Sequence, residues 1–413
     1  MSTDTPEGPY GNFDWSKMTG ADRVTRQMSE LVKGVASPEL TSRILRPYND
    51  RFRELIDKWI TLSEEKNFRN PDSPSGPYSG HLKNGVEGYF EGREATIGSV
   101  SDLNKEIENL VKRAPDLRLL WRGARSVSWG VHSGLFRRLM KENGVVAPGD
   151  SPRGEQDYPD EDQMVEAERR ILTTARNDWR FDGMSALEIF ARIQHFGGPT
   201  RLLDITLNPY VAAWFAVERH EETDEHDSRL LAFSAEPVRA VEDEAAVSSR
   251  VSLDPAWGGY TPLWHQWTDN VARQEFDWGT GSRRWHWIPP AYHSRITVQN
   301  AGFLLDGVPI TSHKMSSYFW PHKNSQPDQA LGKYYRRADL LAVSSIYMKA
   351  DSPSRKPVPR KNNLAPTFGF RIAAEAKNEI RSYLESRFGF TRSYIYPDME
   401  ALAQHLNTVN FTE

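Results

Sequence analysis

The run QHFGGPTRLLDIT, residues 194–206, followed by Asn208 and Pro209, is the stretch that decides the fold. It closes a helical pattern over residues 185–196 and continues as a short buried strand at 201–204. Asn208 is a typical N-cap residue, and Pro209 suits the first turn of a helix, where its missing N–H has no partner to lose. The stretch therefore predicts a helix, a strand and a second helix in close succession.

Helices and strands mix on both sides of this stretch without a regular βαβ rhythm. Apolar stripes and caps predict further helices at residues 101–114, 165–175, 375–388 and from 399 to 406. Short apolar runs predict strands at 117–121, 230–234, 296–305 and 367–372. Ser101 is expected to cap the helix that begins there. This order favours an α+β fold, with helices and short strands around a central sheet, over a doubly wound sheet.

The chain divides at about residue 95. Residues 1–95 are expected to form an N-terminal polar arm and a helical extension, since residues 40–67 carry an apolar stripe and 71–80 are rich in Pro and Gly. Residues 96–413 are expected to form one α+β domain with a Trp-rich insertion at about 250–290.

Composition excludes several classes of protein. The 413 residues contain no Cys, which excludes disulfides, thiolate metal sites, Fe–S clusters and a Cys nucleophile. The net charge of −4 argues against a globally basic nucleic-acid coat. The start lacks an apolar signal core and no stretch is apolar enough to span a membrane, so a cytoplasmic protein without a membrane partner is expected. No metal is expected, because the His- and carboxylate-containing run at residues 220–226 is typical of a solvated loop.

Tryptophan is unusually abundant. Six of the thirteen Trp residues lie in one stretch, together with several arginines: Trp257, Trp264, Trp267, Trp278, Trp285, Trp287, Arg273, Arg283 and Arg284. Interleaved aromatic and Arg side chains can stack nucleobases or surround a sugar or adenine ring. The alternative, which we favour, is that this stretch packs on itself as a small core or lid.

Four blocks resemble the FRG domain, a family named for its Phe/Tyr-Arg-Gly motif. They are LLWRG at 119–123 with Trp129 and 135–137, the central run 194–216, RITVQ at 295–299 with Gly302 and Phe303, and a closing block with Lys377, Ile380, Leu384 and 396–398. The resemblance spans roughly residues 98–407. Trp121 stands in place of the naming aromatic residue, and Ser133 and Gly134 stand where the family has a Pro-containing turn.

The order of these blocks is also similar to that of ADP-ribosyltransferases, which implies NAD as the cofactor. In that similarity Arg122 holds an NAD phosphate, Thr206 supports the nicotinamide ribose, and the third strand supplies the catalytic group. The residue at the third position is Gln299 and not Glu. Asp204, Asp306 or Glu275 would then supply the carboxylate, or the domain would bind a nucleotide without cleaving it.

The candidate site residues follow from these patterns. Catalytic candidates are Asp204, Gln299 and His195; ligand-binding candidates are Arg122, Gly123, Gln194, Arg201 and Thr206. An Arg suits a planar phosphate or carboxylate, Gly allows close approach, and the helix start after Thr206 offers N–H groups to an anion. The architectural alternative is an internal pair between Arg122 and Asp204, with Asp204, Thr206 and Asn208 forming a capping turn. Both interpretations stay open.

Two functions from different classes follow. The first is a nucleotide-binding FRG-domain protein that performs NAD-dependent ADP-ribosyl transfer or NAD hydrolysis, as a toxin-like or phage-defence effector. The second is a non-catalytic module that binds nucleic acid or a protein partner through the Trp/Arg-rich stretch and residues 352–361. A Ser-His-Asp hydrolase is disfavoured, since no Gly-x-Ser-x-Gly elbow is present. The identity of any protein or nucleic-acid acceptor stays open, as does catalysis itself.

Overall fold

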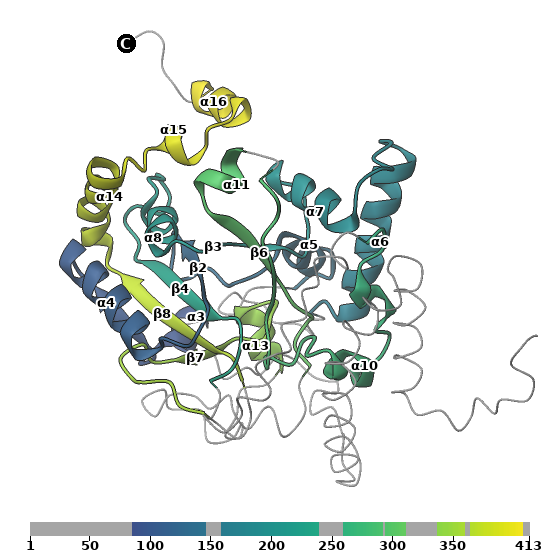
Figure 1. Ribbon diagram of the computed structural model, residues 1–413, viewed down its shortest axis with the longest axis horizontal. Coiled ribbons are helices and arrows are strands. Elements are labelled where there is room, and N and C mark those ends of the chain that lie inside the picture. Colours follow the sequence, from purple (N-terminus) through teal and green to yellow (C-terminus); the bar gives the residue numbers. More distant parts are fainter. Residues whose placement is uncertain are drawn as a thin grey trace, which may run out of the picture.

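The computed structural model describes residues 85–145, 158–238, 259–291, 294–310, 337–359 and 364–407 (Figure 1). Most of the expected N-terminal arm and extension, and Trp257, lie outside the described residues. The expected boundary at residue 95 falls inside a strand of the sheet, Glu94–Ile97. The helix before that strand, α3 (Gly85–Phe90), packs Tyr89 and Phe90 into the core. The folded domain therefore includes residues from Gly85 onward.

A mixed eight-stranded sheet forms the centre of the domain. Its strands are β1 (Glu94–Ile97), β2 (Leu119–Ala124), β3 (Leu203–Thr206), β4 (Ser228–Ser234), β5 (Trp285–Trp287), β6 (Ala301–Leu305), β7 (Lys349–Asp351) and β8 (Pro366–Ile372). The order is β1-β8-β4-β2-β3-β6-β5, and β7 also pairs with β8. β1 and β7 run parallel to β8, whereas the other pairs are antiparallel. The mixed sheet with helices confirms the α+β class.

Helices cover both faces of the sheet. Their bounds are α4 (Val100–Arg113), α5 (Gly134–Glu142), α6 (Glu161–Asn177), α7 (Ala186–His195), α8 (Pro209–Val217), α10 (Asn270–Glu275), α11 (Ser294–Val298), α13 (Arg337–Val343), α14 (Ala374–Phe388), α15 (Arg392–Ile395) and α16 (Met399–Leu406). One core joins β2, β4 and β8 to α4, α8 and α14, and a second joins the opposite face to α3, α5 and α13. A third joins β5 and β6 to α6 and α7. Figure 1 shows α4, α8 and α14 near one end of the sheet and α6 and α7 near the other.

The helix–strand–helix prediction from residues 194–206 is confirmed. Ser185 caps α7 by accepting from the Glu188 N–H, and Asn208 caps α8 by accepting from the Tyr210 N–H, with Pro209 in the first turn. Both caps use a side-chain oxygen a few residues from the N–H that it satisfies, which is why the sequence predicts them well.

Two local predictions are wrong. Ser99, not Ser101, caps α4, because its hydroxyl accepts from the Asp102 N–H while Ser101 is already inside the helix. The predicted strand at 296–305 begins as helix α11 and becomes strand only from Ala301. Asn300, with φ of 46°, makes the turn between them. The β-branched run Ile-Thr-Val therefore adopts a helical turn, an override of local propensity by the tertiary setting.

The Trp-rich stretch is core and not a separate lid. Trp264, Trp267, Trp278, Trp285 and Trp287 are all buried with α6 and α7. Trp285 and Trp287 belong to β5, which pairs with β6 and so extends the sheet.

Arg284, in the same stretch, is also buried, and it donates to the carbonyls of Ser234, Ala365 and Pro366. Arg284 and the Trp rings of the described part of this stretch therefore lie inside the fold.

Candidate functional site

Asp204 is a polar side chain left uncovered in the middle of the sheet. Its neighbours Leu203 and Ile205 point into the core on the α5 side, so Asp204 and Thr206 point to the opposite face. On that face the flanking strands are covered by the α8 group on one side and by the α7 group on the other. The Asp204 side chain is nevertheless 64% exposed. It is therefore reachable from solvent between the two helix groups.

Two side chains hold Asp204 in place. The Gln194 amide, at the end of α7, donates to both Asp204 carboxylate oxygens at 3.2 Å. The Thr200 hydroxyl donates to the Gln194 Oε1 at 2.5 Å and so fixes the amide orientation. Arg122 donates to the Asp204 backbone carbonyl at 2.6 Å, and its Nη1 lies 3.9 Å from Asp204 Oδ2. The carboxylate is thus oriented by an amide and a guanidinium while it remains exposed.

Arg122 lies within β2 and not at its end. β2 pairs with β3 only at Trp121 and Thr206, and beside that pairing the Arg122 guanidinium donates to the Asp204 carbonyl of β3. Burial lowers the pKa of Arg122, and Asp204 partly opposes that effect. The internal contact between Arg122 and Asp204, one of the two alternatives from the sequence, is therefore present.

Arg122 and Thr206 lie on opposite faces of the sheet. Trp121 pairs directly with Thr206, so these two share a face, and Arg122, the next residue along, points to the other. The buried Thr206 hydroxyl donates to the Gln299 carbonyl at 2.6 Å and accepts from the Asn208 N–H at 3.0 Å. The Gln299 amide donates to the Ile395 carbonyl at 3.0 Å. Thr206 and Gln299 therefore organise a turn, and Arg122 does not join them.

Gly123 provides room for a helix and not for a ligand. A Cβ at this position would lie 2.0 Å from the Ala212 carbonyl oxygen and 2.6 Å from the Ala216 nitrogen, both in α8. The Arg-Gly pair thus combines an Arg that bridges two strands with a Gly that lets α8 pack directly on β2.

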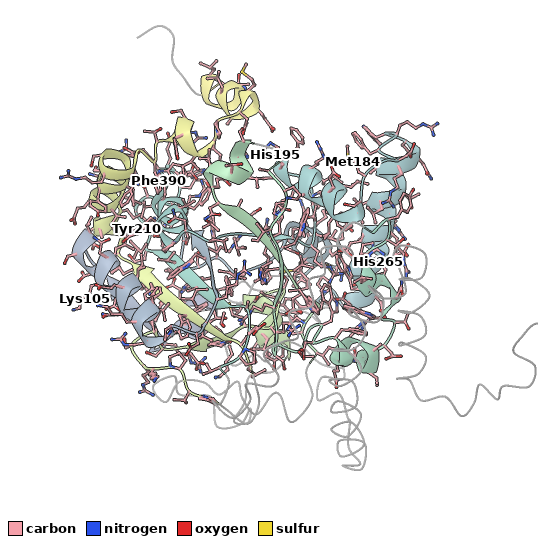
Figure 2. All side chains as sticks on the ribbon, in the orientation of Figure 1. Lys105, Met184, His195, Tyr210, His265 and Phe390 are labelled. Carbon is pink, nitrogen blue, oxygen red and sulfur yellow. The ribbon has the colours of Figure 1, made fainter. Side chains whose placement is uncertain are left out.

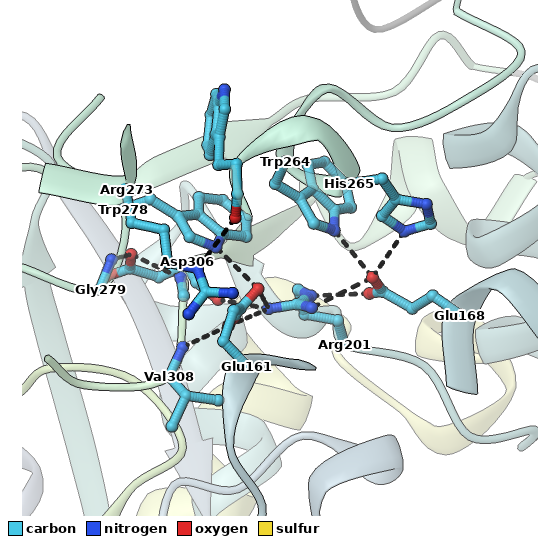
Figure 3. Close-up of polar contacts among 12 residues, drawn as sticks. Glu161, Glu168, Arg201, Trp264, His265, Arg273, Trp278, Gly279, Asp306 and Val308 are labelled. Carbon is cyan, nitrogen blue, oxygen red and sulfur yellow. Dashed lines mark hydrogen bonds and ion pairs between the residues drawn. The ribbon is translucent and has the colours of Figure 1, made fainter. Parts of the chain in front are cut away.

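Arg201 belongs to a buried ionic network, shown in Figure 3. Its side chain is 2% exposed and donates to Glu168 at 2.6 Å and to Glu161 at 2.9 Å. Trp264 and Trp278 donate their indole N–H groups to the same two carboxylates at 2.8 Å. We therefore assign Arg201 to the core and remove it from the ligand-binding candidates.

Glu161 and Glu168 are structural residues that the sequence interpretation missed. Both lie on α6, seven residues apart, which places them on one helix face. Burial alone would raise the pKa of Glu168, but Arg201 and the His265 hydrogen bond outweigh it and lower the pKa to about 2. In the sequence they are two acidic residues on a helix face that is otherwise mainly apolar, a pattern that indicates buried carboxylates.

Asp306 extends this buried region and leads to a prediction about pH. Burial raises its pKa to about 8, even though the N–H groups of Gly279 and Gly307 donate to Oδ1 at 2.7 Å. Because this pKa lies above the ordinary aspartate value of 3.8, the free energy of unfolding is highest below about pH 4, where the carboxyl is protonated in both folded and unfolded chains, and it falls as the pH rises through about 8. We expect Asp306→Asn to flatten this decline in the free energy of unfolding.

Urea unfolding at about pH 5 and about pH 8.5 measures this effect, and Asp178→Asn on the surface is the matched control. The wild type and the control should lose stability between the two pH values more steeply than Asp306→Asn. An identical pH slope in all three proteins would contradict an uncharged, buried Asp306.

His195 is the last residue of α7 (Figure 2). Burial would raise the pKa of Asp398, but the Ala401 N–H and Arg295 lower it, and His195 is close enough to contribute in the same direction. Arg295 Nη2 lies 2.6 Å from Asp398 Oδ2, and its guanidinium lies 5.0 Å from the centre of the Tyr396 ring. His195 thus has an acidic neighbour, which the sequence alone did not identify.

Within the described residues, no group of three or more His, Asp or Glu side chains is arranged to hold a metal ion. In the same part of the chain, no helix has the length and apolarity needed to cross a membrane.

The comparisons with known proteins identify one domain. No curated protein and no solved structure matches the chain. The FRG domain family model matches residues 117–225, which run from just before β2 to just beyond α8. Asp204, with Arg122 and Gln194 that orient it, lies inside this range. The protein therefore carries an FRG domain, as the motifs at 119–123 and 194–206 predict.

Proposed function

We propose that the FRG domain binds a nucleotide at Asp204, with NAD as the ligand, and that it hydrolyses the bond between ribose and nicotinamide. The observation that carries this proposal is the exposed Asp204 carboxylate, held by Gln194 and Arg122 in a sheet whose neighbouring positions are covered. NAD itself comes from the similarity in motif order to ADP-ribosyltransferases. The proposed setting is the cytoplasm, in a toxin-like or phage-defence role.

The chemistry requires a carboxylate at such a position. Breaking the bond between ribose C1′ and the nicotinamide nitrogen creates positive charge on the ribose, and a nearby carboxylate stabilises that transition state. Asp204 can also accept a hydrogen bond from a ribose hydroxyl. Water attacks C1′, nicotinamide leaves with the bonding electron pair, and the proton lost by the water passes to solvent through Asp204 or His195. The products are ADP-ribose, nicotinamide and a proton.

The arrangement differs from the constellation that the transferase similarity implies. In the transferase similarity, Arg122, Thr206 and Gln299 act together on one ligand. Here Thr206 and Gln299 hold a turn, and Arg122 lies on the other face of the sheet. The proposal therefore rests on Asp204, Gln194 and His195, and assigns Arg122 the role of orienting Asp204.

We expect Asp204→Asn to reduce nicotinamide release from NAD by about 100-fold or more, because the amide keeps the shape and loses the charge that stabilises the transition state. Chromatographic measurement of nicotinamide, with NAD binding measured by calorimetry, tests this. Asp178→Asn, at an exposed position beyond α6, is the matched control and should retain activity.

Two results would overturn the proposal: a wild-type protein that neither binds nor cleaves NAD, or an Asp204→Asn variant as active as the control. If the wild type binds NAD without cleaving it, and Asp204→Asn no longer binds NAD, the function is nucleotide recognition at the same carboxylate.

A further inference from the structure

Two strands meet end to end along one edge of β8. β7 pairs with its first half and ends at Asp351, opposite Phe368, whereas β1 pairs with its second half and begins at Glu94, opposite Gly369. The chain leaves the sheet after Asp351 and enters it at Arg93. Neither strand continues across the junction, so side chains and loop backbone from two distant parts of the chain surround this point.

A cavity of about 230 Å³ lies at this junction. Its apolar lining includes Ala350, Pro366 and Phe368, from β7 and β8. The loop that follows β7 forms another wall, and Arg113 of α4 holds that loop by donating to the Pro353 carbonyl at 2.8 Å. The cavity is therefore built from strands and an anchored loop.

The charged side chains that the described residues place around the cavity are mostly positive. They include Arg93, Lys349, Arg355 and Lys356, and Asp351 is the single carboxylate residue among the described lining residues. Lys349 contacts Asp351 at 3.0 Å, so the opposite charges of this pair largely cancel each other. The exposed Arg355 and Lys356 add two positive charges at the mouth of the cavity.

We propose that this junction pocket binds a phosphomonoester with a small body, of the size of a sugar phosphate. A guanidinium binds two phosphate oxygens at once, and an ammonium group adds a compact charge beside it. The apolar wall accommodates the body of the ligand. The volume is below the range of about 300–1,000 Å³ that is usual for drug-sized ligands, so a whole dinucleotide does not fit. This site is separate from Asp204 and does not depend on NAD chemistry.

Calorimetry with the full chain tests the site, using ribose 5-phosphate as the probe and ribose as the same body without phosphate. We expect saturable binding of ribose 5-phosphate that weakens as salt increases, and no binding of ribose. The double variant Arg355→Ala/Lys356→Ala should lower the affinity by about tenfold or more, because two charged contacts are removed. The control Arg138→Ala/Lys141→Ala removes the same charge from the exposed surface of α5 and should leave binding unchanged.

A 5′-phosphorylated oligonucleotide and its 5′-hydroxyl counterpart identify the source of the phosphate. Binding of the phosphorylated form alone, sensitive to Arg355→Ala/Lys356→Ala, would support the site and indicate a nucleic-acid end as the source. Equal binding of ribose and ribose 5-phosphate, absence of saturable binding to either phosphorylated probe, or equal losses in the two double variants would overturn the proposal. Asp204→Asn should bind ribose 5-phosphate normally, which separates this test from that of NAD hydrolysis.

Discussion

Replacing Arg201 with methionine is expected to destabilise the fold by about 3–5 kcal/mol, because the change leaves two buried carboxylates without their cation. Glu161 and Glu168 are 4% and 0% exposed, and both accept hydrogen bonds from the Arg201 guanidinium. Methionine fills a similar volume and supplies no donor. Urea unfolding followed by Trp fluorescence measures the loss directly, since Trp264 and Trp278 contact the same carboxylates.

Arg170→Met is the matched control for this experiment. Arg170 lies on the same helix as Glu161 and Glu168, and it pairs with Glu166 at the surface, so its loss should cost at most about 1 kcal/mol. Adding Glu168→Gln to Arg201→Met should recover part of the stability by removing one uncompensated charge. If Arg201→Met and Arg170→Met unfold at the same urea concentration, the network does not stabilise the fold.

The same network predicts a response to acid. Because the folded pKa of Glu168 is about 2 and the ordinary glutamate value is 4.5, its stabilisation is present above about pH 4.5 and is lost as the pH falls toward 2. Glu168→Gln should be less stable than the wild type near neutral pH and should lose less stability on acidification. Parallel acid unfolding curves for the two proteins would contradict this assignment.

Gly123→Ala is expected to cost about 3 kcal/mol or more, at the upper end of what overpacking costs in a core. The added methyl group would lie 2.0 Å from the Ala212 carbonyl and 2.6 Å from the Ala216 nitrogen, so the backbone of α8 must move away from β2. Backbone atoms in a helix cannot rotate away as a flexible side chain can. Thermal unfolding measured by circular dichroism provides the readout.

Gly183→Ala is the control for the intrinsic effect of replacing Gly, because an added Cβ at that position meets nothing within 4 Å. The control should be neutral or slightly stabilising. A Gly123→Ala protein as stable as Gly183→Ala would show that α8 has more room against β2 than the geometry indicates. It would also reopen Gly123 as a residue that provides access for a ligand.

At the candidate site, the sequence predicts which residues are candidates but not which of them are buried. Asp204 and Gln194 were both selected from one short stretch, and they are in direct contact. Arg201, selected from the same stretch, is sealed in the core. The local sequence does not distinguish the exposed Asp204 from the buried Arg201, because both are charged residues beside the same pair of leucines. Their different burial depends on α6 and on the Trp-rich stretch, which lie far away in the chain.

Local chemistry was sufficient for the elements around residues 194–206, because a cap such as Asn208 acts on an N–H only two residues away. The blocks at 119–123 and 194–216 likewise predict an FRG domain, which the match over residues 117–225 confirms, whereas the blocks at 295–303 and 377–398 lie outside the matched residues. Strand register decided the rest. The pairing of Trp121 with Thr206 places Arg122 and Thr206 on opposite faces of the sheet, since side chains alternate along a strand. That pairing joins residues 85 positions apart, so only the folded chain could show that Arg122 does not share a face with Thr206.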